Sequence, residues 1–231
     1  MLAAAPRATF FHLFGLGRIV IMDASEELFS PKILVLGTGN RKKGAEMAEL
    51  FAPLGFAVKT LADFAEKIDV VEDGRSFAEN AAKKATEQAI FLKMPVLAED
   101  SGIVVDALDG APGIFSARFS GENATDQSNN DLLLEKLAKV PWERRTAHYV
   151  CHMTLADAEG RIIAETSGAC GGRIRFELAG TNGFGYDPLF EVVEYHETFG
   201  RLAPIVKRVI SHRSRAARQM RNILPTLPLF Q

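Results

Sequence analysis

Two adjacent acids, Glu99 and Asp100, are the residues of this chain whose position most clearly suggests chemistry. They follow the apolar run Pro95 to Ala98, which predicts a short buried strand, and they precede Ser101 and Gly102. Carboxylates at the end of a buried strand are costly to desolvate unless a positive charge lies between them. Mg²⁺ meets that need, because it takes oxygen ligands and is usually held by one or two carboxylates together with phosphates. On these residues alone, an ordinary acidic turn remains an equal alternative.

A glycine-containing turn with basic residues follows another strand candidate, Lys32 to Leu36. A helix is expected directly after the turn, because apolar residues recur from Met47 at helical spacing. A strand, a glycine turn and a helix start together aim backbone N–H groups and the helix dipole at phosphate. The pattern is neither a P-loop nor a dinucleotide fingerprint. The basic residues of the turn favour a polyphosphate ligand over a plain connection; the turn residues concerned are Thr38, Gly39, Asn40, Arg41, Lys42 and Lys43.

The next segments supply one further acid and a long loop. Ser76 and Glu79 predict a capping box for a helix that runs to about Lys93, and Glu72 before it either projects into a cleft or is a solvated loop acid. After Gly102, the run Ile103 to Leu108 is expected to fold back as a hairpin partner. A long loop over 110–121 is then expected, and structureless loops of this length are often functional.

Two histidines and a second glycine-rich stretch mark the C-terminal half. His148 and His152 fall in an alternating pattern over 147–155, which predicts a strand and surface positions rather than a metal pair. The stretch over 180–188 contains Phe184, Gly185, Tyr186 and Asp187, which are suited to stacking on a flat ring and bonding its edges. The alternative there is a tight turn with core aromatics.

A final helix is expected to begin after Ser211, which is a good N-cap residue. His212 and Arg213 would lie in its first turn, where cations oppose the helix macrodipole. An anion shared by the helix end and these two side chains would resolve the conflict.

Composition limits the classes of function. The chain has 231 residues, 47% hydrophobic and 24% charged, which fits a globular chain with a substantial core. A net charge of −2 argues against a surface that binds nucleic acid. The two cysteines, Cys151 and Cys170, predict reduced buried thiols rather than a disulfide or a zinc site.

Residues 1–31 differ in composition from the rest of the chain. The run Phe10 to Met22 is apolar, but it is too short and too interrupted to span a membrane. We expect either a disordered extension or a start codon assigned too early, with Met22 as the true start.

Taken together, these stretches resemble the inosine/xanthosine triphosphate pyrophosphatases, a family of enzymes that remove non-standard purine nucleotides. Six segments carry the resemblance in order between Lys32 and about Leu224: Thr38 to Lys43, Phe77 to Ala81, Glu99 to Gly102, Gly110 to Gly113 with Ser116 to Arg118, Gly183 to Pro188, and Lys207 with Ser211 to Arg213. One such motif would be weak evidence for the family, but a chance match of six motifs in the same order is very unusual. Many family members have Asp in place of Glu99, and the family's acid-rich stretch before its lysine is replaced here by apolar residues.

The resemblance implies an α/β fold with an elongated mixed sheet, flanking helices and two lobes around a central substrate cleft, formed by residues 32–231 as one domain. It implies a homodimer that uses Mg²⁺ to hydrolyse ITP, dITP and XTP to the monophosphate and pyrophosphate, and the two reduced cysteines predict a cytoplasmic protein. No nucleic acid or membrane partner is expected. Carried over by motif, Thr38 to Lys43 and Lys207 would bind the phosphates, and Ser101 would touch the substrate. Phe184 to Asp187, His212 and Arg213 would enclose the purine.

By the same resemblance Asp100 is the expected catalytic base, and Asp100, Glu99 and Glu72 are the expected metal ligands. The division of roles between Glu99 and Asp100, the relative use of the three nucleotides and the groups that read the 6-keto oxygen stay open. Two alternatives also stay open. One is a Maf-like pyrophosphatase with another base preference, and the other is a nucleotide-binding sensor without turnover.

Overall fold

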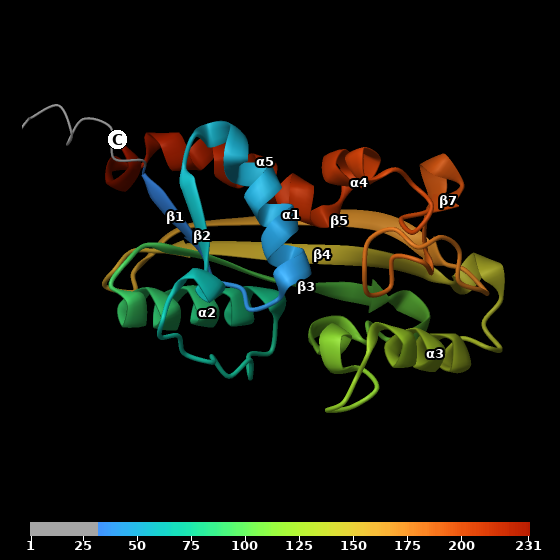
Figure 1. Ribbon diagram of the computed structural model, residues 1–231. Helices are drawn as coiled ribbons and strands as arrows, with labels where there is room; N and C mark the ends of the chain where they lie inside the picture. The colour runs from blue at the N-terminus through green and yellow to red at the C-terminus, as the bar shows by residue number, and fades with distance from the viewer. Residues whose placement is uncertain (1–31) are drawn as a thin grey trace, which may run out of the picture. The chain divides into compact units, whose positions relative to one another are not determined.

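The computed structural model describes residues 32–231, which form a mixed seven-stranded sheet with helices on both faces (Figure 1). The strand order is β2-β1-β3-β4-β5-β6-β7. The strands are β1 (Ile33–Leu36), β2 (Ala57–Thr60), β3 (Val96–Val105), β4 (Thr146–Ala156), β5 (Ile162–Ile174), β6 (Phe190–Val192) and β7 (Glu197–Thr198). The helices are α1 (Arg41–Phe51), α2 (Phe77–Leu92), α3 (Asp126–Lys136), α4 (Pro204–Ile210) and α5 (His212–Ile223). The expected α/β fold is confirmed, and the predictions made for residues 1–31 lie outside the described residues.

Strand direction changes at β3. Strands β2, β1 and β3 run parallel, whereas β3 to β7 pair antiparallel. Parallel neighbours need a crossover connection, and α1 and α2 supply the two crossovers. The long β4 and β5 need only the tight turn at 157–160, as their alternating sequence predicts.

Local sequence accounts for the helix starts. Asn40 caps α1, Thr125 caps α3 and Ser211 caps α5, each accepting backbone N–H bonds with its side chain. Ser76 caps α2 as predicted, but the capping box is not closed. Glu79 accepts instead from the backbone N–H of Arg75, one residue before the cap, at 2.8 Å.

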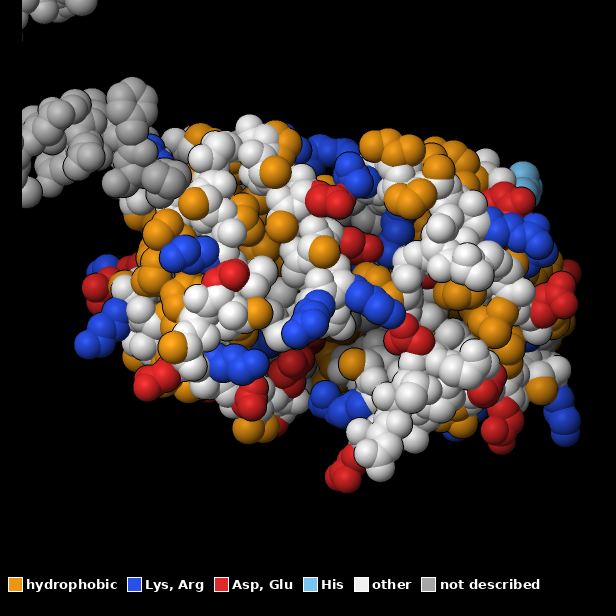
Figure 2. Space-filling view, viewed as in Figure 1, with side chains coloured by type: hydrophobic (Ala, Val, Ile, Leu, Met, Phe, Trp, Pro, Cys, Tyr) orange, Lys and Arg blue, Asp and Glu red, His pale blue; other side chains and the backbone are white. Residues whose placement is uncertain are grey.

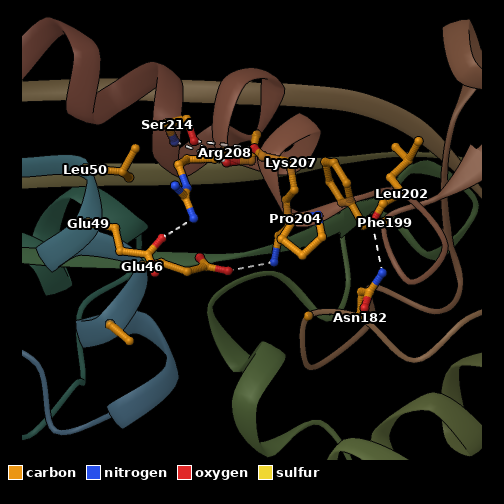
Figure 3. A pocket seen from close by; sticks show the side chains of 13 residues that line it. Glu46, Glu49, Leu50, Asn182, Phe199, Leu202, Pro204, Lys207, Arg208 and Ser214 are labelled. Atoms are coloured by element: carbon orange, nitrogen blue, oxygen red, sulfur yellow. Dashed lines mark hydrogen bonds and ion pairs between the residues drawn. The ribbon is translucent and has the colours of Figure 1, made fainter.

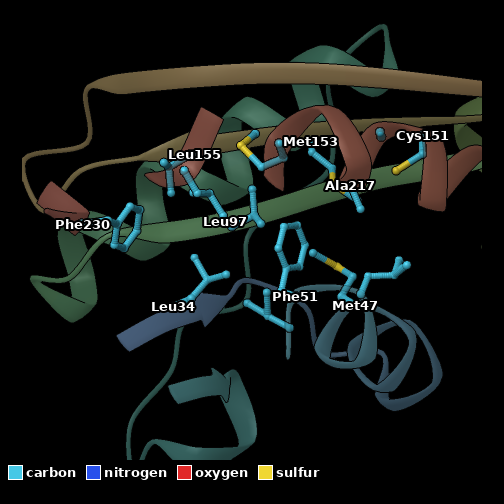
Figure 4. Close-up of a cluster of buried hydrophobic side chains, with 14 residues drawn as sticks. Leu34, Met47, Phe51, Leu97, Cys151, Met153, Leu155, Ala217 and Phe230 are labelled. Atoms are coloured by element: carbon cyan, nitrogen blue, oxygen red, sulfur yellow. The ribbon is translucent and has the colours of Figure 1, made fainter. Parts of the chain in front are cut away.

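The main core lies between the sheet and the pair α1 and α5 (Figure 4). Leu34, Phe51, Leu97 and Met153 are fully buried there. A separate, alanine-rich contact joins α2 to the opposite face, where Ala85 and Ala89 meet Val96 and Ala98 of β3. Small residues let α2 approach the sheet closely, so that side chains of α2 reach the middle of β3.

Three sequence predictions about this region were wrong. The strand does not end at the carboxylates, and 103–108 do not form a separate hairpin strand, because β3 continues through Glu99 and Asp100 to Val105 along ten paired positions of β4. The continuous backbone pairing of β4 outweighs the local turn signal of Ser101-Gly102. The loop over 110–121 is also not structureless, since it contains a 3₁₀ helix, η5 (Gly113–Arg118), packed against β3. Gly102 permits that packing, because a Cβ there would lie 2.3 Å from Ser116 Oγ.

Candidate active site

The candidate site lies where β1 stops beside β3. Strand β1 pairs with β3 only at Val96 and Leu97, so the residues that follow in β3 have a strand neighbour on the β4 side alone. Residues 37–40 leave β1 at this point and begin α1. Crevices at the carboxyl ends of parallel strands are the usual ligand sites of α/β sheets, and Glu99, Asp100 and Ser101 lie in this one.

Side-chain caps hold the turn before α1 in place. Asn40 Oδ1 accepts from the N–H groups of Lys42 and Lys43 at 3.0 and 3.1 Å, and Asn40 N–H bonds Thr38 Oγ1. The first turn of α1 contains no acid, so its positive end is not neutralised locally. An extended anion such as a polyphosphate fits the combination of this helix start with Lys43.

Two cavities meet at this turn. The carboxylate cavity is lined by Gly37, Thr38, Gly39, Asn40, Lys43, Leu61, Lys67, Ile68, Asp69, Val70, Glu72, Lys84, Gln88, Glu99, Asp100, Ser101, Ile114, Ala117 and Arg118. The aromatic cavity is lined by Asn40, Lys43, Ser101, Gly102, Ser116, Ala117, Asp126, Asn129, Tyr149, Phe184, Gly185, Tyr186, Asp187, Lys207, His212 and Arg213. Four residues belong to both sets: Asn40, Lys43, Ser101 and Ala117. Figure 2 shows acidic and basic side chains side by side on the face between α1 and α2.

Asp100 faces α2. Its carboxylate accepts from Asn80 Nδ2 at 3.2 Å and from Lys84 Nζ at 3.1 Å, and Lys84 also lies 3.1 Å from Glu72 Oε2. Desolvation raises the pKa of Asp100 above its ordinary value, although Lys84 and Lys43 oppose the shift. A partly enclosed acid with a raised pKa is typical of a general base.

Glu99 faces the other side of the strand, because successive side chains of a strand point to opposite faces. Its side chain is fully buried and lies 3.3 Å from both Arg213 Nη2 of α5 and Lys43 Nζ of α1. Burial alone would raise the pKa of Glu99, but the cations Arg213, Lys43 and Lys84 lower it far below its usual range. Glu99 is therefore a buried counter-ion that holds two cations at the junction of the cavities.

The aromatic cavity contains a ring surrounded by cations. Lys207 Nζ lies 4.8 Å from the centroid of the Phe184 ring, and Lys42 Nζ and the Arg213 guanidinium lie 5.7 and 5.8 Å from it. Tyr149 and His212 stack on each other at 4.6 Å deeper in the cavity. This arrangement is suited to a planar, anionic ligand that stacks and accepts hydrogen bonds.

The charge conflict predicted for the start of α5 is resolved by protein carboxylates. Arg213 bonds Glu46 Oε2 at 2.5 Å, Glu99 at 3.3 Å and Ser101 Oγ at 2.9 Å. No external anion is therefore needed there, contrary to the expectation. His212 is buried among Arg213, Lys207 and Lys43, and its desolvation together with these cations lowers its pKa well below the usual value, which keeps the imidazole neutral.

Lys207 connects α4 to both sides of the aromatic cavity. Its Nζ donates to Asp187 Oδ2 at 2.6 Å and to Glu46 Oε1 at 2.9 Å. Figure 3 shows Glu46 and Lys207 pointing toward each other across a further cavity between α1 and α4. Desolvation raises the pKa of Asp187 even though Lys207 opposes the shift. Lys207, which was predicted to bind phosphate, lines the aromatic cavity and not the carboxylate cavity.

The cavities bring together nearly all residues singled out in the sequence. Glu72, Glu99, Asp100, Ser101 and the turn residues Thr38, Gly39, Asn40 and Lys43 line the carboxylate cavity. Arg41 lines neither cavity, and Lys42 approaches the aromatic cavity through Phe184 and an ion pair with Asp126. Phe184, Gly185, Tyr186, Asp187, Lys207, His212 and Arg213 line the aromatic cavity.

Three charged or polar residues of the site were given no role from the sequence: Glu46, Lys84 and Asn80, although Asn80 lies in the segment Phe77 to Ala81 that carries the resemblance. Asn80 and Lys84 are four residues apart in α2, which places them on one helical face toward Asp100. Their spacing shows that they share a helix face, but that this face meets Asp100 follows only from the packing of α2 on β3. Glu46 was not singled out, because its pairing with Lys207 and Arg213 depends on the packing of α1 against α4 and α5.

The carboxylate cavity is compatible with a small hard cation. The Lys84 ammonium is already held between Glu72 and Asp100 at 3.1 Å from each, which shows that this pair can hold a positive charge. No group of three or more His, Cys, Asp or Glu side chains arranged for a metal occurs among residues 32–231. A two-carboxylate site of this kind is what Mg²⁺ uses when phosphates complete its shell.

Comparisons with known proteins agree with this geometry. The dITP/XTP pyrophosphatase of Rhodopirellula baltica is 54% identical over 185 residues, covering 80% of this chain and 89% of that protein. That of Desulforamulus reducens is 47% identical over 198 residues, covering 86% and 98%. The structure of a HAM1 protein from Coxiella burnetii superposes with a TM-score of 0.77 at 37% identity, covering 85% of this chain and all of that one. A sequence model described as the Ham1 family matches residues 34–223, and the chain belongs to this family.

Proposed function

We propose that this chain is a nucleoside triphosphate pyrophosphohydrolase that converts ITP, dITP and XTP to the monophosphate and pyrophosphate. The observation that carries the proposal is the junction of two cavities at Asn40, Lys43 and Ser101. One cavity has acids and a helix start for a polyphosphate, and the other has a ring and buried donors for a base. The relatives named dITP/XTP pyrophosphatase support the same activity.

In this proposal the α-phosphate lies at the junction and water attacks it in line, with pyrophosphate as the leaving group. Catalysis of this kind depends mostly on positioning and charge neutralisation. The turn at 38–43 and Lys43 orient the phosphates. Asp100 takes the proton of the attacking water, and its raised pKa makes it a better base than an exposed aspartate. Lys84 holds the Asp100 carboxylate in place.

Asp100 and Glu72 are the residues that would hold Mg²⁺. The bound ion would neutralise phosphate charge and lower the pKa of water in its shell. That Glu99 is a third ligand stays a prediction, since its carboxylate is paired with Arg213 and Lys43.

Selection of the base follows from buried donors. Adenine presents an amino group where hypoxanthine and xanthine present the 6-keto oxygen, so donors aimed at that oxygen would be left unpaired by adenine. Arg213 supplies donors, and the neutral His212 supplies one ring N–H. His212 lines the aromatic cavity, and its buried Nδ1 has no hydrogen-bond partner among the described residues. The backbone N–H of Phe184 is already bonded to Asp187 Oδ2 at 2.8 Å, so it is a poorer candidate.

We further propose a homodimer in the cytoplasm with no nucleic-acid partner. Both cysteines are free and buried, which fits a reducing compartment. Within residues 32–231, none of the helices combines the length and apolar character needed to cross a bilayer. Dimerisation rests on the family resemblance.

The test is pyrophosphate release from ITP, XTP, dITP, ATP, GTP and dTTP, with Mg²⁺ and with chelator. Metal-dependent release from the first three, with the canonical nucleotides nearly inert, is the expected result. Comparable release from dTTP would favour a Maf-like preference, and binding without release would indicate a sensor. Orthophosphate as the product would contradict the mechanism.

A further inference from the structure

Gln88 has a buried polar atom that the protein does not satisfy. The side chain projects from α2 and is 4% exposed, and its Oε1 has no hydrogen-bond partner among the described residues. Oε1 lies directly against Gly37, where a Cβ would come within 2.2 Å of it. An unpaired buried amide oxygen is unfavourable, so its retention needs a reason.

The NH₂ group of the same amide provides that reason. Gln88 lines the carboxylate cavity, and no hydrogen bond within the described part of the chain engages its Nε2. With Oε1 enclosed against Gly37, the NH₂ group is the part left to face the cavity. A donor without a protein acceptor, in a cavity suited to polyphosphate, fits an anionic oxygen of the ligand.

Lys67 adds a positive charge to the same cavity. Of the cavity's other cations, Lys43 is paired with Glu99, and Lys84 with Glu72 and Asp100. Arg118 donates to the backbone carbonyl of Glu72. Lys67 is exposed, and no acid of residues 32–231 lies within ion-pair distance of its Nζ. Its charge is therefore available to a ligand.

We propose that Gln88 and Lys67 form a subsite for the terminal phosphates, which leave as pyrophosphate. This inference rests on the proposed function, and both residues line the carboxylate cavity and not the aromatic cavity. Gln88 donates through Nε2 to a phosphate oxygen, and Lys67 neutralises charge on the outermost phosphate. Neither residue belongs to the six segments on which the family resemblance was based. The subsite favours triphosphates over diphosphates.

The experiment uses the full chain and measures binding of inorganic pyrophosphate by calorimetry. Gln88→Leu removes the amide at nearly constant volume, and Lys67→Met removes the charge from an exposed loop. Matched controls are Gln127→Leu on the exposed face of α3 and Lys139→Met beyond it, both outside the two cavities. Thermal unfolding of each variant reports whether the fold is kept.

Gln88→Leu is expected to weaken pyrophosphate binding about tenfold, as for loss of a hydrogen bond to a charged group. Lys67→Met is expected to weaken it about two- to fivefold, and more at low salt. Both should also lower the ratio of kcat/KM for dITP to that for dIDP, while the controls match the wild type. Wild-type-like binding by both variants overturns the subsite.

A second pair of outcomes separates this inference from the proposed function. If the variants weaken pyrophosphate binding but the wild type releases no pyrophosphate from any nucleotide, the subsite stands and the enzyme assignment falls. If the wild type turns over dITP and both variants keep its pyrophosphate affinity and triphosphate preference, the enzyme assignment stands and the subsite falls.

Discussion

Replacement of Glu99 by Gln distinguishes two roles for this acid, a metal ligand and a counter-ion that positions cations. The substitution keeps the shape of the side chain and removes its charge. Glu99 is fully buried and pairs with Arg213 and Lys43 at 3.3 Å each. Removal of one partner of a buried ion pair usually costs about 3–5 kcal/mol, because the remaining charge is left without compensation.

The cost here should lie at the lower end of that range. Arg213 keeps Glu46 as a partner at 2.5 Å, and Lys43 can turn toward solvent. We therefore expect Glu99→Gln to lose about 3 kcal/mol of unfolding free energy. For a domain of this size each kcal/mol shifts Tm by about 2–4 °C, which gives a decrease of about 6–12 °C. Glu135→Gln on the exposed side of α3 is the matched control and should leave Tm unchanged.

The pH dependence has a definite sign. The cations hold the folded-state pKa of Glu99 far below the unfolded value of about 4.3. Its stabilising contribution is fully present above the unfolded pKa and is lost only as pH falls through the folded pKa. The Tm difference between wild type and variant should be constant from pH 8 to about pH 5 and shrink in acid.

Kinetics complete the test. If Glu99 positions Lys43 and Arg213, the variant raises KM for dITP and leaves the Mg²⁺ concentration for half-maximal rate unchanged. If Glu99 ligates the metal, that Mg²⁺ concentration rises. An unchanged Tm together with an increased Mg²⁺ requirement would refute the counter-ion reasoning.

Three further substitutions separate the remaining roles. Asp100→Asn should lower kcat by at least about a thousandfold while nucleotide binding, measured by calorimetry, persists; full activity would contradict its role as base. Lys84→Met removes a cation that lowers the pKa of Asp100, so the acidic limb of the kcat/KM–pH profile should move to higher pH, and a shift to lower pH would contradict the assignment. Phe184→Leu should raise KM for dITP about fivefold or more through lost stacking, while inhibition by pyrophosphate stays at the wild-type level; a parallel loss of pyrophosphate inhibition would place the ring beside the phosphates instead.

Motifs within short segments were predictable because their physics is local. Ser76 and Ser211 cap helices as expected, and the alternation over 147–155 is a strand that carries His148 and His152. The strand–turn–helix order and the basic residues together predicted a phosphate site at 38–43, and Thr38, Gly39, Asn40 and Lys43 line the carboxylate cavity.

What failed depended on partners far away in sequence. The end of β3 was misplaced because Ser101 and Gly102 read as a turn, whereas ten residues of β4 keep the strand extended. Lys84 and Glu46 were missed because helix spacing alone does not show which helix face meets the sheet. The cations of α5 seemed to need an external anion, since the approach of Glu46 from α1 is visible only in the folded chain.

The length of β3 explains how two neighbouring acids serve different partners. Had the strand ended at Ala98, both carboxylates would have been free to turn toward one cation. In a continuous strand they are fixed on opposite faces. Glu99 is neutralised by α1 and α5 on the side of the main core, whereas Asp100 meets Lys84 and Asn80 of α2 and lines the carboxylate cavity. The same geometry lowers the pKa of Glu99 and raises that of Asp100, so that one acid stays permanently ionised and the other can exchange a proton. A base and a fixed counter-ion can therefore adjoin without sharing a proton, which supports the proposal that Asp100, and not Glu99, is the base.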